Sequence, residues 1–66
     1  MMHTVKSSNI AKVGHDGRAL IVEFTNGSTY QYEGVPAHEL QPLLRAKSVG
    51  AHFAANIRDR YIGKRV

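Results

Sequence analysis

The stretch from Leu20 to Tyr32 constrains the fold most strongly, because it has the pattern of a β-hairpin. Apolar residues occupy every second position from Leu20 to Phe24, and Tyr30 and Tyr32 resume that period after Asn26-Gly27. An Asn-Gly pair between two alternating segments is a strong short-range signal for a tight turn. The sequence therefore predicts two adjacent antiparallel strands here.

The turn of this hairpin allows two registers, which send the tyrosines to different faces of the sheet. A two-residue loop of Asn26-Gly27 places both tyrosines on a half-polar face. A three-residue loop that begins at Thr25, with a left-handed glycine in a bulge, pairs Val22 with Tyr30 and gathers the large apolar groups on one side. We favour the three-residue loop, because the other register buries Gln31 at a cost of about 1–3 kcal/mol if it is unpaired.

A further strand, irregular at its start, is predicted over residues 5–15, before an Asp-Gly turn signal. A two-residue turn after it would oppose Val13 to Leu20 and place small apolar residues on the face of the large ones. Ile10 and Ile21 then lie on the opposite, half-polar face. That face would be open to solvent or to a partner.

Two short helices are predicted after the strands. The first should be short or distorted in its first turn by Pro42, and its stripe at helical spacing consists of Leu40, Leu43, Leu44 and Lys47. Ser48 can cap the second helix, in which Phe53 and Ile57 follow Val49 at four-residue steps on one face. Whether residues 58–66 continue that helix or form an extended tail stays open. The expected fold is α+β, a three-stranded antiparallel sheet followed by two short helices packed on one face.

Length and composition predict one domain over residues 1–66. A chain of 66 residues buries only about 60% of its unfolded surface, which leaves no room for a deep catalytic cavity. The hydrophobic fraction of 42% and the charged fraction of 21% are those of an ordinary soluble protein. Without cysteine there is no disulfide and no thiolate metal site. No segment resembles a signal peptide or a membrane span, so we expect a cytoplasmic protein that binds no membrane.

Positive charge gathers towards the C-terminus. Nine lysines and arginines against five acidic residues give a net charge of +4 at pH 7. Residues 58–66, the basic C-terminal segment, hold four of these cations and one acid. Such a segment favours an anionic partner, although a solvated tail has the same composition.

Several short motifs follow one another in a recognisable order: Val5-Lys6-Ser7-Ser8-Asn9-Ile10, Tyr30-Gln31-Tyr32, Val35-Pro36, the run from Leu43 to Ser48 with Gly50, then Phe53 and Ile57-Arg58. Together they resemble the KTSC domain, a short module that occurs at the C-terminus of some lysyl-tRNA synthetases and as a free-standing protein. The likeness spans nearly the whole chain. His15, where the family often has tyrosine, the short turn at Asp16-Gly17 and Pro42 depart from the pattern. RNA binding has been suggested for the family, so the resemblance implies a binding module with RNA among its partners.

The candidate nucleic-acid contacts are basic residues and one aromatic residue: Lys12, Lys47, Arg58, Arg60, Tyr61, Lys64 and Arg65. Cations neutralise phosphates, and aromatic rings stack on bases. Lys6, Arg18 and His52 are further candidates. Tyr30 and Tyr32 could also stack bases, as sheet aromatics do in RNA-recognition folds. We favour the interpretation that they seat the Leu40 and Phe53 helices on the sheet, because that face is the one the helices cover.

Catalytic and metal chemistry find little support in the sequence. Residues 14–17 spell the G-x-x-G of a nucleic-acid-clamping loop, but they join strands and are explained by turn chemistry. The histidines at positions 3, 15, 38 and 52 are far apart in the chain. We expect no cofactor, no metal and no catalytic residue, and therefore a non-enzymatic module that binds RNA or another polyanion. The alternative is a protein-interaction module that uses the sheet face around Ile10 and Ile21 or an edge strand, and the oligomeric state is open.

Overall fold

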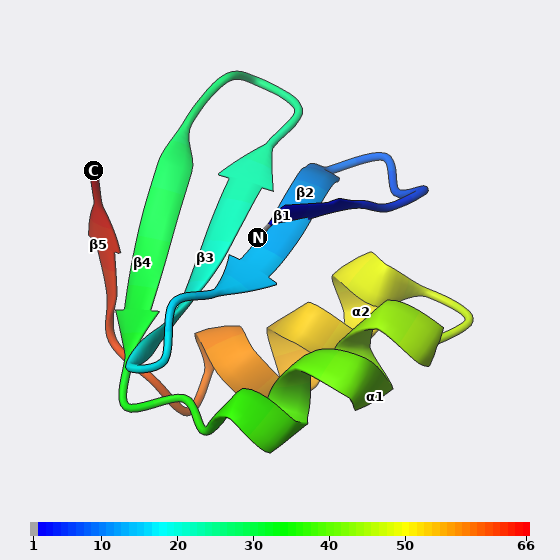
Figure 1. Cartoon of the computed structure of the whole chain (residues 1–66). Coiled ribbons are helices and arrows are strands. Elements are labelled where there is room, and N and C mark those ends of the chain that lie inside the picture. Colours follow the sequence, from blue (N-terminus) through cyan, green and yellow to red (C-terminus); the bar gives the residue numbers. More distant parts are fainter. Residues whose placement is uncertain (1) are drawn as a thin grey trace.

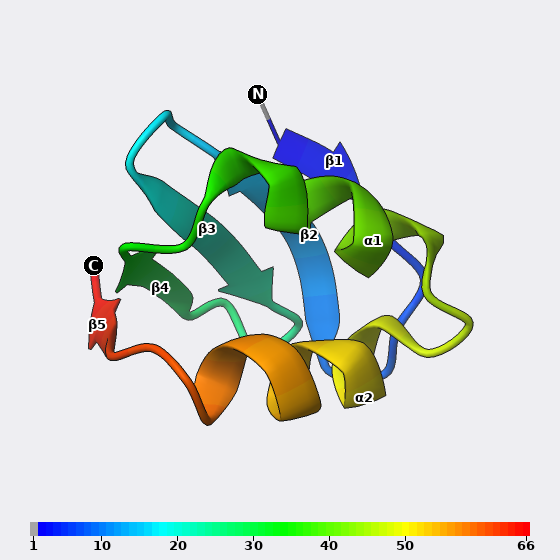
Figure 2. The same ribbon diagram turned by 90° about the horizontal axis from the view of Figure 1, so that it is seen from below.

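The computed structural model describes residues 2–66 as a five-stranded antiparallel sheet with two helices on one face (Figures 1 and 2). The strands lie side by side in chain order: β1 (Met2–Thr4), β2 (Ile10–His15), β3 (Ala19–Phe24), β4 (Thr29–Glu33) and β5 (Gly63–Arg65). The helices follow β4: a 3-10 turn η1 (Ala37–Glu39), α1 (Leu40–Arg45), α2 (Val49–Phe53) and a π-helical turn η2 (Ala54–Arg58). The α+β class is confirmed, whereas the prediction of three strands was wrong.

The two strands that the sequence did not predict form the edges of the sheet. Within residues 2–66, β1 pairs with β2 alone and β5 pairs with β4 alone. Each has three residues, too few for a two-residue period to be visible, so backbone pairing rather than an apolar pattern defines them. β5 also answers the question about residues 58–66, since the chain becomes extended after η2.

None of the helices within residues 2–66 is long and apolar enough to span a bilayer.

The hairpin of β3 and β4 has the predicted register. Val22 pairs with Tyr30 and Leu20 with Tyr32, and Gly27 has a φ of 93°. The loop is closed where the amide of Phe24 donates to the carbonyl of Ser28 at 2.8 Å. The three-residue loop is therefore confirmed, and it places both tyrosines on the helix-covered face.

The hairpin of β2 and β3 has a different register from the one predicted. Val13 pairs with Val22, and His15 pairs with Leu20. The reason is a wider loop: Oδ1 of Asp16 accepts hydrogen bonds from the amides of Arg18 and Ala19 at 2.9 and 2.8 Å. These two bonds hold the pKa of Asp16 below its ordinary value, and the bond from Arg18 has the larger effect. A shift of two residues keeps Val13 on the covered face, so the apolar pattern alone did not exclude it.

A β-bulge in β2 places Ile10 on the covered face of the sheet. The register shifts between Ile10 and Lys12, so one extra residue returns Ile10 to the covered face. Its side chain is 1% exposed, and the prediction that it lies on the open face was wrong. Ile21, which pairs with Gly14 and Gln31, is half-buried on the open face.

The helices close the core over the covered face of the sheet. Oγ of Ser48 caps α2 by accepting a hydrogen bond from the amide of Ala51 at 3.2 Å, as predicted. Val49, Phe53 and Ile57 are buried on one side of α2 and η2. The first helix is short and begins with a 3-10 turn, in line with the proline in its first turn. Lys47 lies beyond the end of α1 and is exposed, so the stripe of that helix does not include it.

Candidate nucleic-acid interface

The basic C-terminal segment leaves η2 at Arg58, turns, and returns to the sheet as β5. The amide of Tyr61 donates to the carbonyl of Ile57 at 2.9 Å, which ends the helical part. Lys64 then pairs with Gln31 and Arg65 with Tyr30. Because side chains alternate along a strand, Lys64 points to the open face and Arg65 to the covered side of the sheet.

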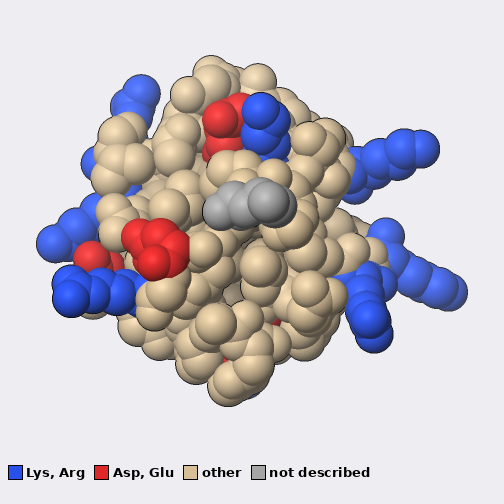
Figure 3. Space-filling model, in the orientation of Figure 1, with Lys and Arg blue, Asp and Glu red and all other residues tan. Residues whose placement is uncertain are grey.

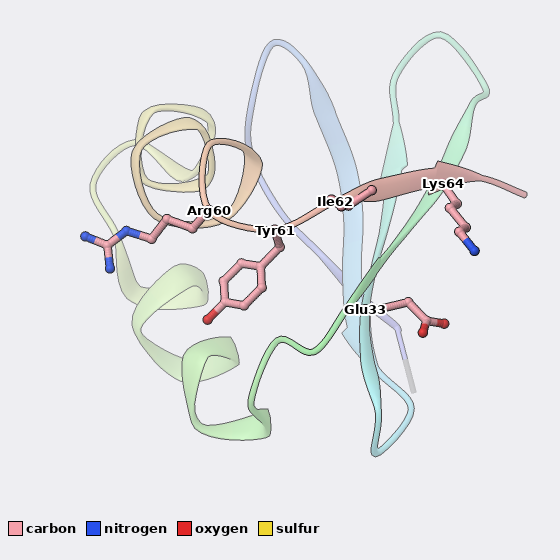
Figure 4. A pocket seen from close by; sticks show the side chains of 5 residues that line it. All are labelled: Glu33, Arg60, Tyr61, Ile62 and Lys64. Atoms are coloured by element: carbon pink, nitrogen blue, oxygen red, sulfur yellow. The ribbon is translucent and has the colours of Figure 1, made fainter.

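A surface hollow of about 410 Å³ lies where this segment rejoins the sheet. Its lining comes from Glu33, Arg60, Tyr61, Ile62 and Lys64. Figure 4 shows Arg60 on the helix side of Tyr61, pointing away from its ring, and Lys64 beyond Ile62 on the side of Glu33. Tyr61 is half-buried against the core, while Ile62 is 80% exposed. The hollow is thus lined by one aromatic residue, one apolar residue, two cations and the carboxylate of Glu33.

Arg58 stays available for a ligand although it has an acidic neighbour. Its Nε atom lies 3.5 Å from Oδ1 of Asp59, and the two side chains are 61% and 67% exposed. An ion pair this exposed contributes little, typically about 0–1 kcal/mol. Burial, and then the neighbouring Tyr30, raise the pKa of the Tyr32 hydroxyl, and Arg58 opposes this rise.

The seven candidate contacts do not form one patch. Lys12 lies on the open face of β2, where it pairs with Thr4 on one side and Glu23 on the other. Lys47 lies in the connection from α1 to α2, at the opposite side of the molecule from β5 (Figures 1 and 2). Figure 3 shows basic side chains projecting from both sides of the molecule. Only Arg58, Arg60, Tyr61, Lys64 and Arg65 share one segment of the structure.

His15 and His52 differ in their surroundings. Nε2 of His15 lies 2.6 Å from the carbonyl of Val35, and Nδ1 accepts from the amide of Gly17 at 3.0 Å. These bonds hold the 14–17 loop as a strand connection. His52 on α2 is half-buried, and its buried Nε2 has no partner within the part of the chain that the structure describes. Across residues 2–66, no three His, Asp or Glu side chains converge as metal ligands.

Tyr32 and Tyr30 differ in burial. Tyr32 is 5% exposed, and its ring contacts that of Phe53 edge to face at 5.2 Å. Tyr30 is half-buried and stacks on Tyr32 at 6.4 Å. Tyr32 therefore packs between sheet and helix, with Phe53 on one side, which leaves it little surface for a base.

The sequence did not predict a second hollow, which lies on the helix-covered side of the sheet. This smaller hollow of about 160 Å³ lies between the end of β3 and the α2–η2 helix. We call it the Phe24 pocket, and its lining includes Asn9, Phe24, Phe53, Ala54 and Arg58. Arg58 was predicted as a nucleic-acid contact, whereas Asn9 was only part of a sequence motif. Their convergence could not be inferred, because they come from segments far apart in the chain.

Comparison with known proteins places this architecture in a family. The family model of the KTSC domain matches residues 6–61. The chain belongs to the KTSC family. A crystal structure of a KTSC domain protein from Yersinia pestis is similar, with a TM-score of 0.89 and 33% identity over 100% of this chain and 96% of that one. An uncharacterized protein of Stutzerimonas stutzeri is 43% identical over 51 residues, which are 74% of this chain and 72% of that protein. A protein of Tsukamurella paurometabola is 36% identical over 62 residues, 91% of this chain and 92% of its own length.

Proposed function

We propose that this KTSC domain is a non-enzymatic module that binds single-stranded RNA or another polyanion through its basic C-terminal segment. The observation that carries the proposal is the hollow beside β5, which is lined by Arg60, Lys64 and the ring of Tyr61. Cations beside an accessible apolar and aromatic surface are the combination with which proteins hold single-stranded nucleic acid. The resemblance to modules at the C-terminus of some lysyl-tRNA synthetases makes RNA the first polyanion to test.

The geometry of β5 suggests how the segment would follow a phosphate backbone. Arg60 and Lys64 lie on either side of the hollow, and Arg65 projects to the covered side at the end of the strand. Together with Arg58 they offer four positive charges. Four phosphate contacts with a single strand give a slope of log K against log salt near −3, and roughly a 50-fold loss of affinity between 50 and 200 mM salt.

The test compares two variants with the same change in net charge. Arg60→Gln/Lys64→Gln/Arg65→Gln removes three cations of the segment, and Lys6→Gln/Lys12→Gln/Lys47→Gln removes three exposed cations elsewhere. Fluorescence anisotropy with a labelled single-stranded RNA should show a salt slope near −1 for the first variant and a slope near −3 for the second. Equal slopes for the two variants would contradict binding through this segment.

The alternative of a protein-interaction module loses part of its basis in the structure. Ile10 is buried, so it cannot contribute to a partner surface on the open face. In the described part of the chain the outer edge of β5 has no neighbouring strand and could accept one. Its Lys64 and Arg65, however, are charged residues of the kind with which proteins discourage such pairing. An affinity for RNA that is absent at every salt concentration, together with a protein partner insensitive to salt, would favour this alternative.

A further inference from the structure

The Phe24 pocket has the volume and the lining of a site for one aromatic ring. Its volume is about 160 Å³, equivalent to roughly five water molecules at about 30 Å³ each. Drug-sized ligands occupy pockets of about 300–1,000 Å³, so the space suits one aromatic ring. The half-buried Phe24 lines the pocket, together with Phe53 and Tyr32, which expose only 4% and 5% of their surface.

The aromatic rings around the pocket are fixed by contacts with one another. Phe24 contacts Phe53 at a centroid distance of 5.8 Å and an interplanar angle of 72°. Phe24 also contacts the ring of Tyr30, at a centroid distance of 5.6 Å and an interplanar angle of 86°. A ring held by two neighbouring rings is already oriented, so the binding of a ligand would cost little side-chain entropy at Phe24.

Two polar groups of complementary chemistry stand at the mouth of the pocket. The side-chain amide of Asn9 forms no hydrogen bond within residues 2–66, so its donor and its acceptor are both free. The guanidinium of Arg58 is exposed at the same pocket. An amide can read the edge of a base, and a guanidinium can hold a phosphate.

The pocket is also continuous with surfaces on either side. A shallow hollow of about 360 Å³, lined by Asn9, Phe24, Thr25 and Asn26, shares two of its residues with the pocket. At the other end, Arg58 is the first cation of the basic C-terminal segment. A strand of nucleic acid bound to that segment could therefore pass Arg58, and its next residues could cross Phe24.

We propose that the Phe24 pocket receives one unstacked nucleobase of a bound single-stranded RNA, with Asn9 on the base edge and Arg58 on the adjoining phosphate. This inference rests on the proposed function and adds a base-binding site to a phosphate-binding one. Single-stranded RNA suits the site because its bases can be splayed out and stacked on aromatic side chains. Binding of phosphates by the basic C-terminal segment would not need such a pocket. Stacking of a base on the sheet tyrosine Tyr32, which is buried, would not need it either.

The experiment fills the pocket and compares two probes. Ala54 lines it, whereas the adjacent Ala55 is exposed and does not, so Ala54→Leu and Ala55→Leu form a matched pair. Asn9→Ala tests the polar contact without adding bulk. Anisotropy is measured with a labelled oligouridylate and with an abasic oligomer of the same length and charge, and thermal melting verifies that each variant is folded.

We expect the wild type to bind the oligouridylate at least about fivefold more tightly than the abasic oligomer, the lower limit for one stacked base. Ala54→Leu should remove that preference and Asn9→Ala should reduce it, while Ala55→Leu should retain it. Should Ala54→Leu fail to fold, the result for Asn9→Ala decides.

The contradicting outcomes separate this inference from the proposed function. Equal binding of the two probes by the wild type would overturn the base pocket and leave polyanion binding intact. Binding of neither probe would overturn both. A tyrosine-containing acidic peptide that loses affinity on Ala54→Leu, while the oligouridylate does not, would assign the pocket to a protein ligand and overturn the assignment to a base.

Discussion

Replacing Gly63 by alanine tests how β5 is attached to the core. Gly63 pairs with Tyr32 across the β4–β5 ladder. A Cβ atom at this position would lie 2.6 Å from Cζ of the Tyr32 ring and closer still to Cε2. The ring cannot withdraw, because Phe53 contacts it at 5.2 Å and Tyr30 stacks on it. Either the ring is forced into its neighbours or β5 moves away from the sheet.

The expected cost follows from these two routes. Overpacking of a filled site costs about 1–3 kcal/mol in the free energy of unfolding. For a domain of this size each kcal/mol shifts the melting temperature by about 4–8 °C, so a decrease of roughly 4–24 °C should appear in a thermal melt followed by circular dichroism. If β5 detaches, the amide of Val66, which donates to the carbonyl of Thr29 at 2.8 Å, should also lose its protection from hydrogen exchange.

Gly50→Ala provides the matched control. A Cβ there would meet only Oγ of Ser7, at 3.4 Å, which is ordinary contact. Gly50 is in the first turn of α2. In a helix interior alanine is favoured over glycine by about 1 kcal/mol, so the control variant should be as stable as the wild type or slightly more stable. If Gly63→Ala melted within about 2 °C of the wild type, the close packing of Gly63 on Tyr32 would be refuted.

Three further predictions concern stability. Tyr32→Ala should lower the free energy of unfolding by about 3–5 kcal/mol, because the ring is buried, and Tyr30→Ala by about half as much, because it is half-buried; equal losses in urea titrations would contradict this difference. Ser48→Ala should cost about 1 kcal/mol by removing the cap of α2, with recovery in Ser48→Asp, and no loss in urea unfolding would argue against the cap. The lowered pKa of Asp16 means that its contribution to stability is complete above the pKa of the unfolded chain and is lost as the pH falls through the folded value. The urea midpoint of the wild type should therefore fall more than that of Asp16→Asn between neutral pH and about pH 2, and parallel pH profiles would exclude this role.

The central hairpin could be predicted because two independent constraints agreed on its register. The turn chemistry allowed a glycine with positive φ, and the alternative register buried Gln31. The cap at Ser48 was predictable for a similar reason, since a local hydrogen bond links it to the start of the helix. These features depend on residues close together in the chain.

The features that escaped prediction depend on side-chain hydrogen bonds or on distant segments. The Asp16 side chain widens its loop by binding two amides, and the bulge before Lys12 turns Ile10 inward. Neither alters the apolar pattern enough to be visible in the sequence. Within the candidate site, the clustering of residues 58–66 was visible in the chain, whereas the separation of Lys12 and Lys47 from that segment required the folded topology.

The attachment of β5 has a consequence for the order of folding. The strands β2, β3 and β4 are joined by short loops, so their pairing closes small loops and is fast. β5 instead pairs Arg65 with Tyr30 across the whole helical region, and this closure carries a larger entropic cost. The last strand should thus dock onto a core that is already formed and should be the first to open. A polyanion that binds only the docked form would hold this strand closed, so its affinity should be detectable as slower hydrogen exchange at Val66.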